Sequence, residues 1–207
     1  MSTDKSLFHY GRLYHSLFDR LLAGAWRVAV DLVPERSSVL DIGCGTGQLC
    51  FDLQEGRHCR VTGVDLSLRM LDYARDASSG THVSFLHLDA TDLAGIDDDA
   101  FDLATILLLV HELPREMRVR VVREALRVSR AALIIDAASP LPWTAEGSVI
   151  RLVEYTFGHD HAAHFRDFVT RGGIMGLLEE SGDSASVARR FLFLQKSREA
   201  VVVQRQL

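Results

Sequence analysis

The chain contains little of what marks several classes of protein. Its 207 residues include three cysteines, none of them in a C-x-x-C pair, so we expect buried, reduced thiols rather than a disulfide framework. Only four prolines are present, and no internal repeat or low-complexity tract interrupts the chain. We therefore expect a single domain over residues 1–207.

Long apolar runs and an excess of positive charge are also missing. The longest strongly apolar run, residues 104–110, is far shorter than the roughly 20 residues that a membrane-spanning helix needs. With 23 Lys and Arg against 28 Asp and Glu, the formal net charge of -5 gives no general attraction to a phosphate backbone. The arginines of residues 115–130 scatter around a helix and interleave with acids, which favours a solvated helix over an RNA-binding one.

The first residues contain no apolar stretch of the kind found in secretory signals. The sequence thus predicts a cytoplasmic protein with no membrane or nucleic-acid partner. It makes no prediction of the oligomeric state.

Short apolar runs alternate with helical patterns through the middle of the chain. This alternation predicts βαβ units, and hence a mainly parallel sheet with helices on both faces. The predicted strands are Ser38–Ile42, Arg60–Val64, Val83–Leu88, Phe101–Leu107 and Ala131–Ala137. The predicted helices between them are Gln48–Gln54, Ser67–Asp76 and Glu116–Val128.

The two ends of the chain add to this unit. A stripe of leucines at helical spacing predicts an amphipathic helix, and with it a helical cap over residues 1–36. Two β-rich runs, Val187–Gln195 and Glu199–Gln204, are separated by three residues and predict an antiparallel hairpin. Residues 138–183, between the fifth strand and the hairpin, are predicted to form a helical segment that covers the substrate.

Three glycines alternate where the first predicted strand turns into a helix: Gly43, Gly45 and Gly47. Glycine allows a positive φ and lets a ligand approach the backbone closely, and free amides at a helix N-terminus suit an anionic group. The dinucleotide pattern G-x-G-x-x-G requires a third glycine where Gln48 stands, and a P-loop requires a lysine that residues 41–56 lack. The loop therefore predicts a nucleotide-sized ligand of another kind.

Acidic residues end each of the first three predicted strands. Asp41, Asp65 and Asp89 are spaced about 24 residues apart, and the carboxyl ends of parallel strands share one edge. Asp65 is placed to accept the hydroxyls of a ribose, and Asp89 to accept a hydrogen bond from an adenine amine. Each acid alone would serve equally well as a helix cap or turn residue. Together they predict one adenosine across three strand ends.

These motifs resemble those of the class I S-adenosylmethionine-dependent methyltransferases, in particular the small type 11 group related to ubiquinone and menaquinone biosynthesis methyltransferases. The motifs that carry the resemblance are Asp41-x-Gly43-x-Gly45-x-Gly47, Asp65-x-Ser67, Leu88-Asp89-Ala90, and Leu109 to Pro114. The resemblance implies a single Rossmann-like domain of three α/β/α layers. Its mostly parallel seven-stranded sheet would have an antiparallel last strand.

The resemblance also implies S-adenosylmethionine as the cofactor. The glycine loop would meet its methionine moiety, with Asp41 supporting the amino group, Asp65 binding the ribose, and Asp89 with Ala90 flanking the adenine. The complete set of implied cofactor residues is Asp41, Gly43, Cys44, Gly45, Gly47, Asp65, Leu66, Asp89, Ala90 and Leu107.

The acceptor side of the site is predicted from polar and aromatic residues. Because a sulfonium methyl group is already activated, the protein mainly has to position the acceptor and exclude water. His111, which follows the fourth strand, is the candidate general base, and its alternative role is to orient its loop or to pack under the cofactor. The predicted substrate pocket consists of Tyr10, Tyr14, His111, Trp143, Tyr155, His161 and His164.

A cluster of histidines raises the question of a metal. His159, Asp160, His161 and His164 lie close in sequence, and three of them would share one helix face. No fourth ligand is evident, so we expect these residues to line or cap the pocket, or to form a solvated helical turn, and predict no metal. The predicted activity is methyl transfer to a small, partly apolar molecule. The alternatives are a regulatory module that binds the cofactor without turnover, and methylation of RNA or protein.

Overall fold

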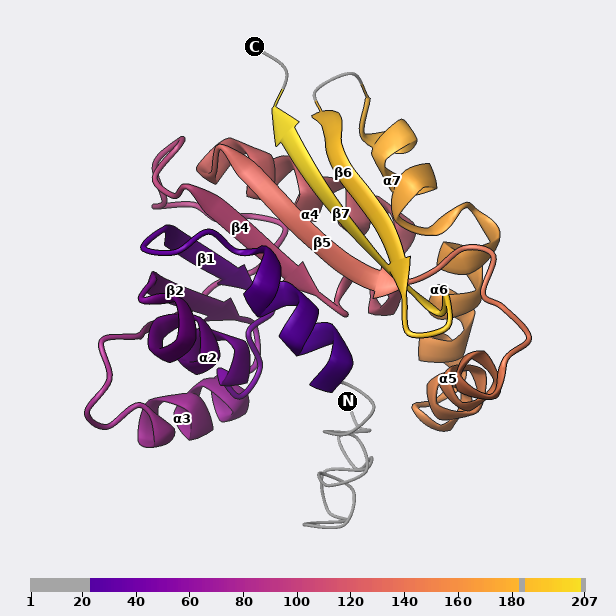
Figure 1. Cartoon of the computed structure of the whole chain (residues 1–207), viewed down its shortest axis with the longest axis horizontal. Coiled ribbons are helices and arrows are strands. Elements are labelled where there is room, and N and C mark those ends of the chain that lie inside the picture. Colours follow the sequence, from indigo (N-terminus) through magenta and orange to yellow (C-terminus); the bar gives the residue numbers. More distant parts are fainter. Residues whose placement is uncertain (1–22, 183–184, 206–207) are drawn as a thin grey trace.

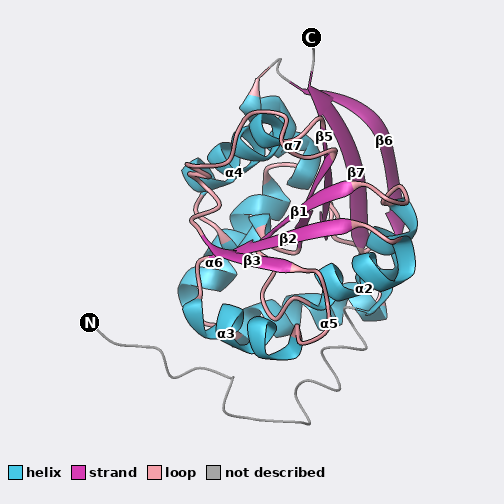
Figure 2. Cartoon of the chain, turned by 90° about the vertical axis from the view of Figure 1, so that its left-hand side faces the viewer, coloured by secondary structure: helices cyan, strands magenta, loops and turns pink. Residues whose placement is uncertain are grey.

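The computed structural model describes residues 23–182 and 185–205. These residues form three layers, with helices on both faces of a seven-stranded sheet (Figures 1 and 2). The strand order is β3-β2-β1-β4-β5-β7-β6. The predicted fold class is therefore confirmed. Tyr10, Tyr14 and most of the predicted N-terminal cap lie outside the described residues.

Five strands run parallel, as the sequence predicted: β1 (Ser38–Ile42), β2 (Arg60–Asp65), β3 (Ser84–His87), β4 (Leu103–Leu107) and β5 (Ala131–Ala137). The predicted fourth strand began two residues too early. Phe101 instead forms an isolated bridge with Ser129, and its amide donates to the carbonyl of Val128.

The last two strands form the predicted hairpin. β6 (Ala185–Phe193) pairs antiparallel with β7 (Arg198–Arg205), and β7 pairs antiparallel with β5. β7 is thus inserted between β5 and β6, and it is the strand that opposes its neighbours in direction.

The helices are residues 23–32, α2 (Gln48–Arg57), α3 (Leu68–Ala77), the 3-10 turn η1 (Val110–Glu112), α4 (Arg115–Val128), α5 (Ala145–Thr156), α6 (His159–Thr170) and α7 (Gly173–Ser181). Ser67, where this helix was predicted to begin, caps α3, because its side chain accepts a hydrogen bond from the amide of Met70. α2 extends past its predicted end at Gln54, continues through Gly56, and is capped at His58 in a left-handed conformation.

The two faces of the sheet build two apolar clusters. Alternate residues of each strand point to opposite sides, so Leu133 and Ile135 of β5 face one cluster while Ala132 and Ile134 face the other. Helix 23–32, α2 and α3 cover the first face, and α4, α6 and α7 cover the second. Burial on both sides explains why the central strands are apolar almost throughout.

Residues 138–182 contain helices α5, α6 and α7, and one buried arginine connects them to α4. Arg118 is 3% exposed and donates hydrogen bonds to the carbonyls of Leu113 and His164 and to the carboxylate of Asp167. Its guanidinium also lies 5.5 Å from the centre of the Phe168 ring. The prediction of a solvated helix is wrong at Arg118, because this side chain points into the interface between α4 and α6.

A buried carboxylate links β1 to its neighbour. Asp41 lies opposite Thr105 of β4 and accepts a hydrogen bond of 2.7 Å from its hydroxyl. The thiol of Cys50 donates to the other carboxylate oxygen over 3.3 Å. Burial raises the pKa of Asp41 to about 6, although both hydrogen bonds act to lower it. The negative charge of Asp41 therefore costs stability in the folded protein.

Replacing Arg118 by alanine is expected to lower the free energy of unfolding by about 2–4 kcal/mol, because two carbonyls and a carboxylate lose their donor. Urea unfolding of the variant measures this loss. Arg120→Ala, at an exposed position on the same helix, is the control and should change stability by less than about 0.5 kcal/mol. Equal effects of the two substitutions would contradict the bridging role.

Asp41→Asn is expected to make stability less dependent on pH. The folded pKa of Asp41 lies above the unfolded value, so this group favours folding at low pH and the advantage is lost as the pH rises through about 6. The full difference amounts to about 3 kcal/mol at most. Unfolding free energies at pH 5 and pH 8 should therefore differ less in the variant than in the unsubstituted protein.

The matched control for this measurement is Asp102→Asn. Hydrogen bonds from the amide and hydroxyl of Ser38 lower the pKa of Asp102, so this carboxylate stays ionised in both states between pH 5 and pH 8. The control should leave the pH dependence in that window unchanged. An Asp41→Asn profile parallel to that of the unsubstituted protein would show that Asp41 does not carry the effect.

Candidate active site

The carboxyl ends of the central strands meet at one edge of the sheet. β1 lies between β2 and β4 and is parallel to both. The glycine loop that follows β1 therefore lies between Asp65, the last residue of β2, and Leu107, the last residue of β4. This is the edge where the sequence placed the cofactor.

The three glycines of the loop have different surroundings. All have positive φ, at 76° for Gly43, 53° for Gly45 and 81° for Gly47. A Cβ at Gly43 would lie 2.9 Å from Leu109, and one at Gly47 would lie 2.7 Å from Phe85. A Cβ at Gly45 would have nothing within 4 Å. Gly43 and Gly47 are therefore needed for packing, whereas Gly45 presents the backbone to open space.

The prediction that the loop carries free amides is wrong for four of its residues. The amides of Gly43 and Cys44 both donate to the carbonyl of Val64, and the amide of Gly47 donates to the carbonyl of Cys44. The amide of Gly45 donates to Asp65. The loop folds back onto the end of β2, which satisfies these donors. Helix α2 begins without a side-chain cap, so its N-terminus keeps the electrostatic character that favours an anion.

Asp65 joins the loop to the start of α3. One carboxylate oxygen accepts from the amide of Gly45 over 2.8 Å, and the other accepts from the amide of Ser67 over 2.7 Å. An ionised carboxylate has about four acceptor positions, so two remain for ligand hydroxyls. Leu66, next to Asp65, is 63% exposed at the same edge. The geometry suits both roles that the sequence allowed for Asp65.

Asp89 takes the turn role that was the alternative to adenine binding. Its Oδ1 accepts from both the amide and the hydroxyl of Thr91, each over 2.8 Å. Ala90 packs against the apolar cluster on the α4 side of the sheet, while Cys44 and Leu107 belong to the cluster on the other side. Contact of Asp89 with an adenine stays a prediction.

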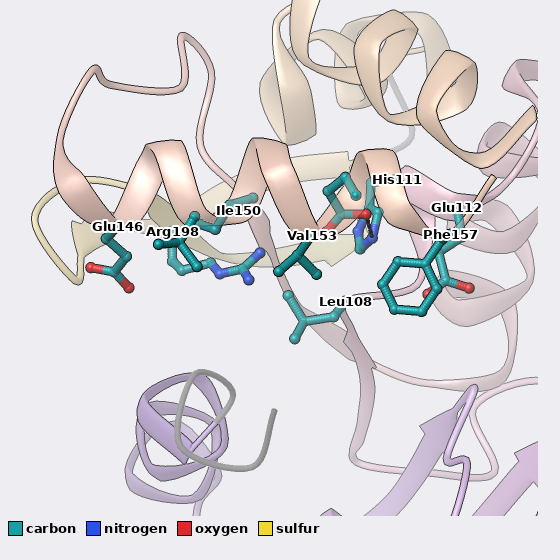
Figure 3. A pocket seen from close by; sticks show the side chains of 10 residues that line it. Leu108, His111, Glu112, Glu146, Ile150, Val153, Phe157 and Arg198 are labelled. Atoms are coloured by element: carbon teal, nitrogen blue, oxygen red, sulfur yellow. Dashed lines mark ion pairs between the residues drawn. The ribbon is translucent and has the colours of Figure 1, made fainter. Parts of the chain in front are cut away.

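A pocket of about 160 Å³ lies beyond the end of β4 (Figure 3). Its lining residues are Leu108, His111, Glu112, Glu146, Val149, Ile150, Val153, Glu154, Phe157 and Arg198. The turn of residues 108–111 separates this pocket from the glycine loop, since Leu109 packs on Gly43 while Leu108 and His111 line the pocket. The turn of residues 108–111 thus contacts the glycine loop on one side and forms part of the pocket wall on the other.

His111 is held between two carboxylates in this wall. Its Nδ1 lies 2.7 Å from Oδ1 of Asp136, and its Nε2 lies 3.5 Å from Oε2 of Glu154. Asp136 also accepts the backbone amide of His111. Burial acts to lower the pKa of His111, but Asp136 and Glu154 outweigh it and raise the pKa to about 10. An imidazolium, with protons on both ring nitrogens, cannot act as a base, so the geometry favours the alternative in which His111 orders its own turn, residues 108–111.

Glu154 is the centre of a group that the sequence did not predict. Its Oε2 lies 2.5 Å from Nε2 of His161 as well as 3.5 Å from His111. Burial acts to raise the pKa of Glu154, but its bonds to His111 and His161 outweigh this and lower it to about 2. The cluster of His111, Glu154 and His161 is therefore rich in charge although it is largely buried.

The predicted pocket residues divide into two groups. His111 lines the pocket, and His161 packs against it, with the two ring centres 5.8 Å apart. His164 instead bonds through Nδ1 to the backbone carbonyl of Glu112, which ties α6 to η1. Trp143 and Tyr155 are 87% and 72% exposed and do not line this pocket. Helical phase explains the position of Tyr155, because the other face of α5 lines the pocket, and Trp143 precedes that helix.

The predicted group of histidines on α6 does not converge. His159 and Asp160 have side chains that are 98% and 100% exposed, and only His161 joins another potential ligand group. Sequence analysis also missed Asp136, Glu154 and Arg198. An available signal was the placement of two acids in otherwise apolar patterns, Asp136 in a buried strand and Glu154 on the stripe that also carries Ile150 and Phe157.

Comparisons with known proteins agree with this architecture. Residues 39–132 match a family model described as a methyltransferase domain. A putative methyltransferase, YqeM, of Bacillus subtilis is 34% identical over 99 residues, which is 45% of this chain and 39% of YqeM. The 27-O-demethylrifamycin SV methyltransferase of Amycolatopsis mediterranei is 29% identical over 163 residues, or 72% of this chain and 56% of the relative.

A relative with a different kind of substrate is the tRNA 5-carboxymethoxyuridine methyltransferase of Escherichia coli. It is 36% identical over 81 residues, which is 37% of this chain and 31% of that protein. The chain thus spans about half or less of the length of these curated relatives.

Among solved structures, the PH0226 protein from Pyrococcus horikoshii has a TM-score of 0.69 at 17% identity and covers 95% of this chain and 93% of its own. That likeness shows the fold. The match of residues 39–132 to the methyltransferase-domain model, these curated relatives and the motifs at the edge of the sheet support a class I, type 11-like S-adenosylmethionine-dependent methyltransferase.

Proposed function

We propose that this chain transfers the methyl group of S-adenosylmethionine to a small-molecule acceptor bound in the pocket beside β4. The turn of residues 108–111, which contacts both the glycine loop and the pocket, supports this proposal most directly. Leu109 packs against Gly43 of the glycine loop, and His111, two residues later, lines the pocket. A cofactor on the loop and an acceptor in the pocket would meet across this turn.

The residues at the sheet edge fit the cofactor. Gly45 leaves open space for a close approach, Asp65 keeps two acceptor positions for the ribose hydroxyls, and Leu66 offers an exposed apolar surface. The bound cofactor supplies an activated methyl group on a sulfonium sulfur. The proposed cofactor residues are Asp41, Gly43, Cys44, Gly45, Gly47, Asp65, Leu66, Asp89, Ala90 and Leu107.

The pocket suits a small, partly apolar acceptor. Val149, Ile150 and Val153 of α5 form apolar walls, and His111 and Arg198 add polar groups between them (Figure 3). Apolar walls with a few converging polar groups are typical of small-molecule sites. Residues 138–183 act in this proposal as the cover that excludes water, and His111 is the residue that contacts the acceptor.

Asp65→Ala is expected to weaken binding of the demethylated cofactor by at least about 1.5 kcal/mol, because two charge-assisted hydrogen bonds to the ribose are lost. Isothermal titration of the purified chain measures the change. Asp76→Ala removes an exposed acid from α3 and should bind as the unsubstituted protein does. Tight binding by the Asp65 variant would refute the ribose contact.

His111→Ala is expected to reduce methyl transfer at least about tenfold while changing binding of the demethylated cofactor by less than about twofold, because the side chain faces the pocket rather than the loop. The measurement is release of S-adenosylhomocysteine during incubation with a panel of small hydroxylated, carboxylated and aromatic acceptors. His159→Ala, at an exposed position, is the control and should retain full transfer.

The same assay separates the alternatives. Cofactor binding without turnover on any acceptor of the panel would favour a regulatory module over an enzyme. Turnover with unmodified tRNA, strongly reduced by added salt, would favour the RNA substrate that the Escherichia coli relative's name suggests for that protein. Either result would overturn the small-molecule proposal.

A further inference from the structure

Three side chains from three separate elements meet beside the pocket. His111 comes from the turn after β4, Glu154 from the last turn of α5, and His161 from the first turn of α6. One ligand atom of each lies within 4.8 Å of the other two. Gly158, with a φ of 113°, interrupts the helical conformation between α5 and α6. This break brings His161 opposite Glu154.

We propose that His111, Glu154 and His161 bind one divalent transition-metal ion, with zinc as the best fit. Two imidazole nitrogens and one carboxylate oxygen form a ligand set that zinc accepts, and three protein ligands leave one tetrahedral position open. The ligand atoms are Nε2 of both histidines and Oε2 of Glu154. This site differs from the group of histidines on α6 that the sequence suggested, since it shares only His161 with it.

The distances suit an ion after a small adjustment. Tetrahedral ligands about 2.0–2.1 Å from zinc lie roughly 3.3 Å apart, and Nε2 of His111 is 3.5 Å from Oε2 of Glu154. Nε2 of His161 is 2.5 Å from the same oxygen, a hydrogen-bond distance. These two atoms have to move apart by about 0.8 Å to admit the ion. A small rotation of the His161 side chain on the first turn of α6 would provide this separation.

Asp136 provides the outer support that metal-binding histidines usually have. It accepts hydrogen bonds from Nδ1 of His111 and from the backbone amides of His111 and Ala137. A carboxylate at one ring nitrogen fixes the tautomer whose other nitrogen binds the metal. The side chain of Asp136 is fully buried. Its position is therefore set by the strand rather than by solvent.

Aromatic rings hold the two histidines in place. The Phe165 ring meets His111 edge to face with 5.6 Å between ring centres, and the Phe157 ring lies 5.0 Å from His161. Such walls restrict ring rotation and keep solvent from the ligands. Side-chain exposure is 5% for His111, 9% for Glu154 and 17% for His161.

The charges around the cluster favour a cation. Asp136 and Glu154 flank His111, and Glu112 and Glu146 lie in the pocket wall. Arg198 is the permanent cation among the described lining residues, and its Nε and Nη1 are buried without a hydrogen-bond partner. Four carboxylates outnumber the one guanidinium, and a divalent ion would take the place of the proton on Nε2 of His111 and neutralise this excess negative charge.

The open coordination position indicates the class of acceptor. His111 and Glu154 both line the pocket, so an ion between them would face a bound molecule with that position. A metal ion there would select acceptors with an oxygen donor, such as a hydroxyl or carboxylate. This step, unlike ion binding itself, rests on the proposed methyltransferase function.

The test uses the full chain without a histidine tag, stripped of metal by a chelator and titrated with zinc by calorimetry. One ion per chain is expected. Glu154→Gln and His161→Ala should each weaken binding by about 100-fold or more, whereas His159→Ala, an exposed histidine on the same helix turn, should bind like the unsubstituted protein. Cobalt substitution should give the visible absorption of a four-coordinate site.

The outcomes are separable from those for the proposed function. Absence of stoichiometric zinc, or equal affinity in all variants, would overturn the metal site. Binding of S-adenosylhomocysteine by each variant shows whether it is folded and tests the cofactor site independently. X-ray absorption of the zinc-loaded, unsubstituted protein requires no variant, and a spectrum without two imidazole ligands would also refute the site.

Discussion

The parallel pairing of β1 with β2 on one side and β4 on the other is the constraint on which the site depends. It brings three strand ends to one edge, so the glycine loop, Asp65 and the turn after β4 become neighbours although they are far apart in sequence. The apolar clusters on both faces of the sheet hold this pairing. The backbone around the loop is then fixed by packing, through Leu109 on Gly43 and Phe85 on Gly47.

Most of the sheet was predictable because its local signals are strong. The β-branched runs, the glycine spacing and the cap at Ser67 each encode a local conformation, and these led to five parallel strands and a terminal hairpin. The residues around the loop were brought together as expected. The errors were local as well: α2 passes Gly56, and β4 starts only at Leu103 because Phe101 pairs elsewhere.

The acceptor side was much less predictable, since its contacts depend on the angle between helices. An exposed histidine and a largely buried one in the same first turn of α6 have the same local sequence signal, so His159 and His161 could not be distinguished. Glu154 and Arg198 lie 44 residues apart in the numbering but line the same pocket. Arg118 was mispredicted for the same reason, because charged residues are frequent in the helix around it, while its partners in space are two carbonyls, the carboxylate of Asp167 and an aromatic ring.

The glycine loop and the opposite wall of the pocket are supported by different parts of the chain, and this separation has an evolutionary consequence. One side of the turn of residues 108–111 supports the glycine loop through Leu109, while the opposite wall of the pocket comes mainly from a single helix, α5. Exchanges on the inner face of α5 would therefore alter which molecules enter without disturbing the loop. Diversification of substrates within this architecture would then be expected to concentrate in one short helical insertion, leaving the sheet edge unchanged.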